Sequence, residues 1–132
     1  MTVEKIILAF VERINQHDPK GLVALMTEDH LFIDSLGNRI KGKEKMLAAW
    51  QGYFAMMPDY HIQIEKTFDS KDEVVLFGTA RGTYAVEGKL IKENQWEIPA
   101  AWRAVVQNGL VKEWQVYADN SVVWEIVKRN RR

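Results

Sequence analysis

The sequence contains no cysteine among its 132 residues. Disulfides, zinc sites built on thiolates and cysteine nucleophiles are therefore excluded, which agrees with a reducing compartment. An excess of charge is lacking too, since 18 lysines and arginines balance 18 aspartates and glutamates. Because no overall field attracts nucleic acid or an anionic membrane, we expect neither as a partner.

Segments for membrane insertion or export are also missing. No apolar run approaches the roughly 20 residues that cross a bilayer, and residues 1–5 lack the basic and then apolar order of a signal peptide. We therefore expect a cytoplasmic protein. The basic residues of 128–132 are interpreted as a solvated end that complements a helix C-terminus, rather than as a nucleic-acid site.

Patterns for metal or phosphate binding are absent from the sequence. There is no glycine-rich phosphate loop. His30 and Asp34 share one face of a predicted strand, but about 13 Å separates them at roughly 3.3 Å per residue, which is too far for one metal ion. We predict no metal and no cofactor.

What is present is a globular composition, with 47% hydrophobic and 27% charged residues. We predict a single domain over residues 1–132, long enough to bury roughly two thirds of its unfolded surface. Helical periodicity alternates with strand periodicity along the chain. We expect helices at 3–16, 42–57 and 121–129, a short helix after residue 18, and strands around residue 32 and at 60–68, 74–86, 90–107 and 110–118.

Local signals mark where these elements start and turn. Asp18 and Pro19 form an N-cap followed by proline at the first helical position. Gly78 and Gly82 indicate bends or bulges in a curved strand. Asn108-Gly109 is the strongest hairpin signal, because both residues accept positive φ. Helices followed by an antiparallel meander predict an α+β fold with a curved sheet wrapped around the N-terminal helices.

A candidate pocket is centred on residues 28–57. His30, Phe32 and Asp34 lie on one face of an extended segment, because side chains alternate at period two. The following helix carries an aromatic stripe that includes Trp50 and Tyr53. Together they predict a cavity whose aromatic wall suits a flat apolar ligand.

Five tryptophans are many for this length. Core packing and a dimer interface account for most such rings, because aromatic side chains dominate both environments. We place Trp50, Tyr53, Trp102 and Tyr117 in the cavity.

Three segments, at residues 17–37, 42–50 and 108–126, resemble the SnoaL-like branch of the nuclear transport factor 2-like superfamily. They are similar to the family's second helix and first strand, its third helix, and its final strand and tail: HDPKGLVALMTEDHLFIDSLG, GKEKMLAAW and NGLVKEWQVYADNSVVWEI. The resemblance implies a cone-shaped α+β barrel with a deep apolar cavity and a homodimer through the outer sheet face. Members of this superfamily include polyketide cyclases, ketosteroid isomerases, limonene epoxide hydrolases, dehydratases and binding proteins without catalysis.

The resemblance implies roles for two carboxylates. Asp34 is similar in position to the general base of ketosteroid isomerases, and Asp119 to an acid/base of SnoaL-type cyclases and epoxide hydrolases. Each has a structural alternative, since Asp34 could cap the turn at 35–38 and Asp119 the helix that follows it. His30 is either a pocket base or donor, or a satisfied strand histidine.

The sequence departs from both enzyme patterns. The two hydrogen-bond donors of the isomerase correspond to Phe10 and approximately Ala100, which cannot donate, and losing such donors costs several kcal/mol of transition-state stabilisation. The hydrolase pair Arg-x-Asp reads Arg81-Gly82-Thr83, without its carboxylate. The known isomerase and hydrolase mechanisms are therefore disfavoured.

The leading hypothesis is a protein that binds a compact hydrophobic molecule and performs cofactor-free isomerase, cyclase or lyase chemistry. Asp34 and Asp119 would carry the protons, with Arg81 or Arg103 as an electrostatic helper. The alternative is a non-catalytic ligand-binding or dimerisation module of the same fold. Both carboxylates in one pocket would favour the enzyme, whereas both committed to turns or caps would favour the module.

Overall fold

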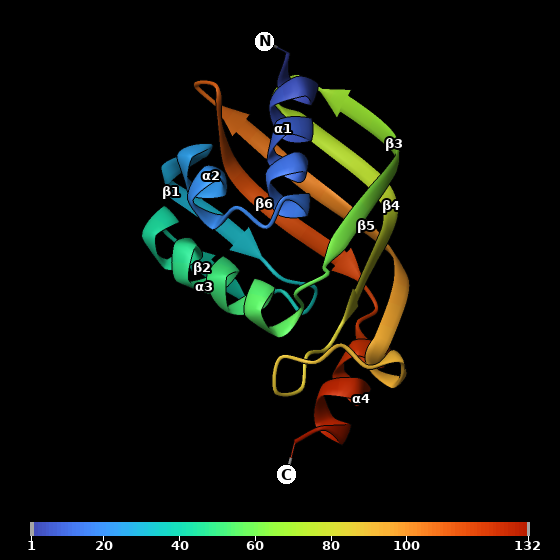
Figure 1. Ribbon diagram of the computed structural model, residues 1–132. Coiled ribbons are helices and arrows are strands. Elements are labelled where there is room, and N and C mark those ends of the chain that lie inside the picture. Colours follow the sequence, from blue (N-terminus) through green and yellow to red (C-terminus); the bar gives the residue numbers. More distant parts are fainter. Residues whose placement is uncertain (1, 132) are drawn as a thin grey trace.

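Figure 1 shows the computed structural model of the protein, which describes residues 2–131. A curved six-stranded sheet runs in the order β2-β1-β6-β5-β4-β3, with helices on its concave side. The helices are α1 (Val3–Asn15), α2 (Pro19–Ala24), α3 (Lys43–Met56), α4 (Ser121–Arg129) and the short 3-10 helix η1 (Lys92–Asn94). The strands are β1 (Met26–Ile33), β2 (Arg39–Lys41), β3 (His61–Ser70), β4 (Glu73–Thr83), β5 (Gln95–Gln107) and β6 (Leu110–Ala118).

The predicted α+β fold is confirmed, with one correction to the sheet. Strands β3 to β6 form the expected antiparallel meander, but β1 pairs with β6 in parallel, with Phe32 opposite Trp114. Strand β2 was not predicted; it folds back on β1 after the turn, with Leu31 opposite Lys41. No helix within residues 2–131 is long and apolar enough to cross a membrane.

The predicted hairpin between β5 and β6 is present. Asn108 and Gly109 have φ values of 52° and 78°, as a type I′ turn requires. The predicted strands at 74–86 and 90–107 are shorter than expected, because β4 ends at Thr83 and β5 begins at Gln95. The backbone between them leaves the sheet, and Ala85 N donates to Met56 O at the end of α3 instead.

Gly78 occupies the point where the sheet bends. The register between β3 and β4 shifts between Ile64 and Lys66, directly beside this glycine. A Cβ at residue 78 would collide with the backbone oxygen of Gln63. The bulge and close strand approach therefore need a residue without a side chain, as the sequence indicated.

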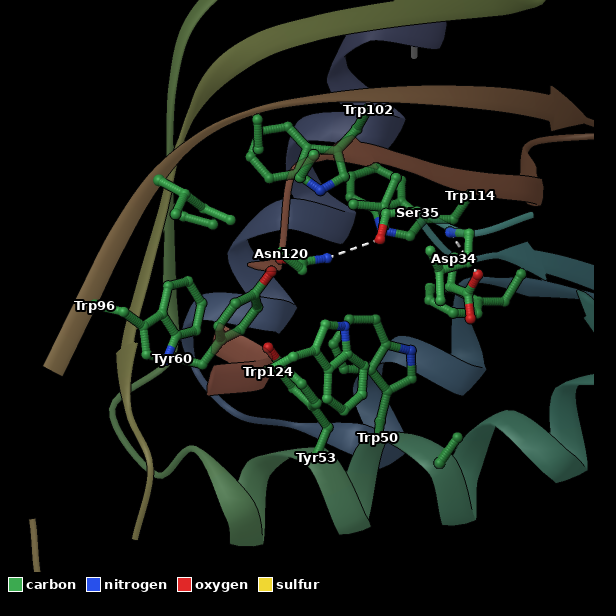
Figure 2. Close-up of a pocket in the computed structure, with 18 of the residues that line it drawn as sticks. Asp34, Ser35, Trp50, Tyr53, Tyr60, Trp96, Trp102, Trp114, Asn120 and Trp124 are labelled. Atoms are coloured by element: carbon green, nitrogen blue, oxygen red, sulfur yellow. Dashed lines mark hydrogen bonds between the residues drawn. The ribbon is translucent and has the colours of Figure 1, made fainter. Parts of the chain in front are cut away.

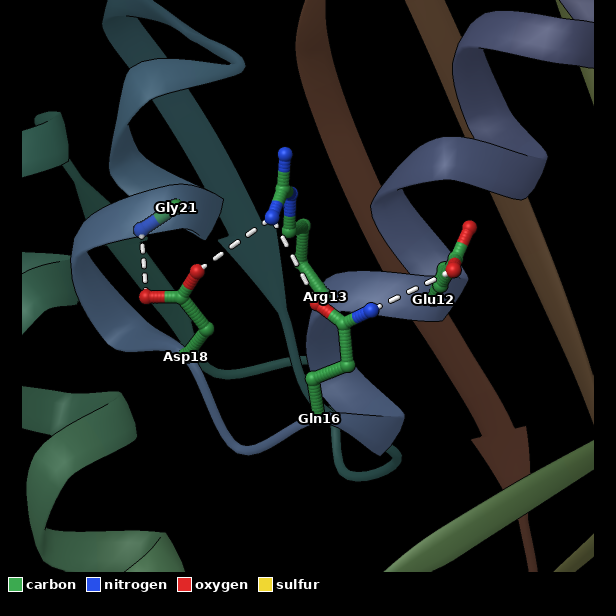
Figure 3. Close-up of polar contacts among 5 residues, drawn as sticks. All are labelled: Glu12, Arg13, Gln16, Asp18 and Gly21. Atoms are coloured by element: carbon green, nitrogen blue, oxygen red, sulfur yellow. Dashed lines mark hydrogen bonds and ion pairs between the residues drawn. The ribbon is translucent and has the colours of Figure 1, made fainter.

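The corner between α1 and α2 is closed by polar contacts (Figure 3). Asp18 Oδ1 accepts from Gly21 N at 2.9 Å, which caps α2 as predicted. Asp18 Oδ2 lies 3.5 Å from Arg13 Nη1, and the same guanidinium nitrogen donates to Gln16 Oε1 at 3.4 Å. Gln16 Nε2 donates to Glu12 Oε1 at 3.2 Å. These exposed contacts fix where α2 starts.

The core lies between α1 and the inner face of the sheet. Helix α1 buries one apolar stripe, including Ile7, Phe10 and Ile14. The Phe10 ring centroid is 5.0 Å from that of Trp114 on β6. This end of the sheet is filled by the rings of Phe10 and Trp114.

Candidate functional site

A cavity of about 280 Å³ lies between α3, the inner face of the sheet and the start of α4. Figure 2 shows its wall, where aromatic rings from α3, β5, β6 and α4 converge. All five tryptophans of the chain line it: Trp50 from α3, Trp96 and Trp102 from β5, Trp114 from β6 and Trp124 from α4. The aromatic wall predicted from the sequence is therefore present.

Small residues on the central strands create the space. Ala100 on β5 lies opposite Ala118 on β6 and Gly78 on β4. Ala80 and Ala100 both face the cavity, where larger side chains would fill it. Trp96, Ala100 and Trp102 are separated by even numbers of residues, so they lie on the same face of β5. This face therefore carries a large, then a small, then a large side chain.

Helix α3 supplies the opposite wall. Trp50 is 6% exposed, and its ring packs edge-on against Phe32 and Tyr53 at centroid distances of 6.4 and 6.3 Å. Trp50 Nε1 is buried and has no hydrogen-bond partner among residues 2–131. Tyr53 in turn meets Tyr60 edge-on at 4.9 Å. These perpendicular contacts hold the rings in fixed orientations.

Two tyrosine hydroxyls point into the cavity, from Tyr53 and Tyr60 (Figure 2). Burial raises the pKa of both phenols, and for Tyr60 the neighbouring Tyr53 adds to the effect. Both therefore stay neutral at physiological pH and can donate a hydrogen bond. Within the described chain, neither hydroxyl is hydrogen-bonded to another residue, so both donors are open to a ligand.

Asp34 lies at the cavity wall, but its carboxylate also holds the turn after β1. Its Oδ1 accepts from Leu36 N and from Asn38 N, both at 2.9 Å. Its Oδ2 accepts from Asn38 Nδ2 at 3.1 Å. The turn-capping alternative considered for Asp34 is thus what the geometry shows, although the carboxylate still borders the cavity.

Asp119 lies outside the cavity wall. Its exposed carboxylate accepts from Ser121 N at 3.0 Å at the start of α4, and this backbone hydrogen bond lowers its pKa. The neighbouring Asn120 lines the cavity instead, where its Nδ2 donates to Ser35 Oγ at 2.8 Å. The two predicted catalytic carboxylates therefore do not face one space.

Three other predicted site residues also lie elsewhere. His30 is fully buried in the core, where its ring centroid lies 6.1 Å from that of Phe10. Arg81 is exposed on β4 and borders a separate polar depression. Tyr117 is 52% exposed on the outer face of the sheet.

Arg103, the other candidate helper, points to the outer face of the sheet as well. Its guanidinium pairs with Glu73 at 2.5 Å and Glu113 at 2.9 Å. These carboxylates raise the pKa of the Arg103 guanidinium, with Glu113 contributing most. Arg103 is therefore committed to a surface ion-pair network.

His30 makes one polar contact in the core. Its Nδ1 lies 2.7 Å from Val111 O, so Nδ1 carries the hydrogen, because a carbonyl oxygen can only accept. Its Nε2 has no partner among the described residues. Burial lowers the pKa of His30, more than the Val111 contact and the nearby Asp29 and Glu113 raise it. The ring is therefore held neutral as part of the core.

Phe32, Trp50, Tyr53 and Trp102 line the cavity as the sequence indicated. The sequence reasoning missed several others: Ser35, Tyr60, Trp96, Trp114, Asn120 and Trp124. Trp96 was within reach, because it lies six residues before Trp102 and so shares its strand face. Nothing local marked Asn120 or Trp124, since their position depends on how α4 docks.

The site has little capacity for a metal ion. Within residues 2–131, no group of three or more histidine, aspartate or glutamate side chains could hold one. The cavity wall is instead aromatic, with one carboxylate, one hydroxyl of serine, one amide and the two phenols as its polar side chains. Such a wall can enclose an apolar molecule and orient it through a few hydrogen bonds.

Comparison with known proteins gives the family and the fold. A SnoaL-like domain model matches residues 7–114. A protein from Shewanella denitrificans, provisionally described as a SnoaL-like polyketide cyclase, superposes with a TM-score of 0.82 at 18% identity, covering 96% of this chain and 97% of its own. A Catenulispora acidiphila protein with a ketosteroid isomerase-like fold, solved in complex with trimethylamine, superposes with a TM-score of 0.79 at 21% identity. The match covers 92% of this chain and 91% of its own.

A third similar structure is IdmH from Streptomyces antibioticus, provisionally described as a polyketide cyclase. Its TM-score is 0.78 at 20% identity, over 97% of this chain and 99% of its own. A search of curated proteins found no match. Identities this low establish a shared fold, and the family model extends over most of the sequence. The chain therefore belongs to the SnoaL-like domain family.

Proposed function

We propose that this protein is a ligand-binding module that holds a compact hydrophobic molecule in its aromatic cavity. The observation that carries the proposal is the cavity of about 280 Å³ lined by all five tryptophans. Ligand pockets typically measure about 300–1,000 Å³, so this one suits a molecule of one or two rings. A ligand that buries roughly 200 Å² of apolar surface gains about 5 kcal/mol before the costs of association.

The polar groups of the cavity wall indicate which functional group of the ligand is recognised. The neutral hydroxyls of Tyr53 and Tyr60 are free to donate to a carbonyl or hydroxyl oxygen. Relatives provisionally described as polyketide cyclases support a ring-bearing molecule with such oxygens. The ligand class proposed is therefore a compact cyclic alcohol, phenol or ketone.

The hydrogen bonds of the two carboxylates favour ligand binding over acid/base catalysis. Asp34 accepts three hydrogen bonds within its own turn, and Asp119 accepts from Ser121 N in the turn before α4, outside the cavity. A general base must reach its substrate proton within hydrogen-bond distance. The two-carboxylate relay considered from the sequence lacks that geometry.

Intrinsic tryptophan fluorescence tests the proposal, because every indole lies at the cavity. We expect saturable changes on titration with compact phenols and cyclic ketones. Ala100→Leu should fill the cavity and weaken binding at least tenfold, because Ala100 faces into it. Ala55→Leu is the control, since Ala55 is exposed on α3 and lies outside the cavity wall. Equal binding by both variants, with unchanged melting temperatures, would contradict the proposal.

One observation favours a second candidate function, proton transfer by Asp34 alone. Asp34 borders the cavity, and its Oδ2 has a single N–H partner, which leaves lone pairs available. A bound enolisable ketone would then exchange its α-hydrogens for deuterium faster than in buffer, and Asp34→Asn would abolish the effect. Exchange no faster than in buffer, with binding intact, would favour the binding module.

The outer face of the sheet supports the predicted homodimer, which we also propose. Phe68, Phe77 and Tyr117 are 59%, 45% and 52% exposed there. Phe68 and Phe77 touch edge-on at 6.0 Å. Neighbouring apolar side chains left open on one sheet face are typical of a protein interface.

A further inference from the structure

The charge on the cavity wall is of one sign. Among the described residues that line it, Asp34 is the one charged side chain, and no lysine, arginine or histidine faces the space. The rings add to this, because the face of an aromatic ring carries the negative part of its quadrupole. The described wall therefore contains one anionic group and several ring faces, and no cationic group to balance them.

We propose that the cavity selects a cation with apolar substituents, namely a tertiary or quaternary ammonium on a compact ring or chain. This inference rests on the proposed function, because it specifies the ligand of the same cavity. An alkylated ammonium suits the wall in two ways. Its methyl groups bury apolar area against the rings, and its charge is attracted to the ring faces, most strongly to tryptophan.

The carboxylate of Asp34 is held in place rather than free to follow a ligand. Two backbone N–H groups bind Oδ1 and the Asn38 side chain binds Oδ2. A fixed negative charge at the wall needs little reorganisation when a cation arrives. The anchored carboxylate can attract a cation held against the ring faces without a direct ion pair, because the attraction between charges extends beyond contact distance.

An anionic ligand is disfavoured by the same side chains. It would meet the ring faces and Asp34 without a compensating cation. The arginines that the sequence suggested as helpers are elsewhere, with Arg81 exposed on β4 and Arg103 paired with Glu73 and Glu113. Burying an anion without a partner carries a large desolvation cost.

Three phenols of matched shape test the inference by calorimetry. They share a phenolic hydroxyl and differ in the para group: 4-hydroxyphenyltrimethylammonium is a cation, 4-tert-butylphenol is neutral, and 4-hydroxybenzenesulfonate is an anion. We expect the cation to bind at least tenfold more tightly than the neutral phenol, and the anion to bind weakest.

Two changes to the protein then separate the charge effects from shape. Asp34→Asn keeps an oxygen for the two backbone N–H groups, although it gives up the acceptor for Asn38 Nδ2. It should weaken binding of the cation about tenfold and binding of the neutral phenol much less. Asp119→Asn is the matched control, because that carboxylate caps a turn outside the cavity. Replacing tryptophan throughout by 5-fluorotryptophan changes the five cavity indoles and no other residue, and it should weaken only the cation, since fluorine withdraws charge from the ring face.

The outcomes distinguish the two proposals. Neutral phenol binding as tightly as the cation, or a cation preference that survives both changes, overturns the inference and leaves the binding function standing. If none of the three phenols binds, the proposed function fails and the inference fails with it.

Discussion

The buried histidine gives a sharp test of the core. His30 is fully buried, its Nδ1 donates to Val111 O, and its Nε2 has no partner among residues 2–131. Protonation would place a charge on a fully buried ring that packs against Phe10 in the core. Burial accordingly lowers its pKa below the ordinary value of 6.5. We predict that His30 contributes a stability that decreases as pH falls through 6.5.

The sign follows from proton linkage. In the unfolded chain the imidazole takes up a proton as pH falls through 6.5, whereas in the folded protein it stays neutral to lower pH. The unfolded state therefore binds more protons, and the free energy of unfolding falls as pH falls. The slope approaches about 1.4 kcal/mol per pH unit at most, the value for one proton, until the folded pKa is reached.

Urea unfolding at half-unit pH steps measures this slope. His30→Asn is the test variant, because an amide N–H can replace the Nδ1 donor but does not titrate. We expect lower stability from the lost ring volume, together with a much flatter pH dependence. His61→Asn is the comparison variant. Burial, followed by the charges of Arg81 and His17, lowers the pKa of His61 too, but His61 is only partly buried, so its removal should flatten the slope less than the removal of His30. An unchanged slope in His30→Asn would refute the reasoning.

Three further predictions concern backbone, cap and interface. Gly78→Ala should destabilise by about 2 kcal/mol or more, because the new Cβ meets the Gln63 oxygen, whereas Gly52→Ala in open space on α3 should stabilise by about 0.5–1 kcal/mol in urea melts. Asp18→Ala should cost about 1 kcal/mol in the same melts, and Asp18→Asn, which keeps the capping oxygen, much less. Phe77→Asp should yield monomers in analytical ultracentrifugation without affecting ligand binding, and a dimer retained by this variant would argue against the outer-face interface.

The fold was predictable where signals are local. The Asp18 cap, the bend at Gly78 and the Asn108-Gly109 turn each depend on a few neighbouring residues, and all three appear in the structure. Strand β2 and the parallel pairing of β1 with β6 depend on partners distant in sequence. Three residues, Arg39–Lys41, are too few to show periodicity, so only the tertiary fold reveals that strand.

The sequence predicted the aromatic character of the candidate site but not which residues line it. Alternation told which residues share a face, yet whether Trp102 lines a cavity or fills a core depends on the size of the residues opposite. Ala100 lies beside Ala118 and Gly78 only because of the strand register, which the sequence does not display. The two aspartates posed the same problem, because a turn-capping carboxylate and a catalytic one have the same local sequence.

The C-terminal helix shows how a tail judged solvated contributes to the site. Of the basic residues 128–132, Arg132 lies outside the described residues. Arg129 Nη2 donates to Glu93 O at 2.6 Å and to Asn94 Oδ1 at 3.2 Å, and Asn94 is 1% exposed. These bonds tie α4 to η1, directly before β5, and α4 carries Trp124 into the cavity wall.

The contact between Arg129 and η1 should therefore influence ligand dissociation. Removing a charge-assisted bond of an exposed arginine costs about 1 kcal/mol, and we expect Arg129→Ala to raise the Kd about fivefold through faster dissociation, measured by stopped-flow tryptophan fluorescence. The melting temperature should change little, because Val123, Ile126 and Val127 keep α4 anchored in the core. Lys128→Ala, an exposed cation one residue earlier, should leave dissociation unchanged. Equal dissociation rates in the two variants would show that Trp124 is held by the apolar contacts of α4 alone.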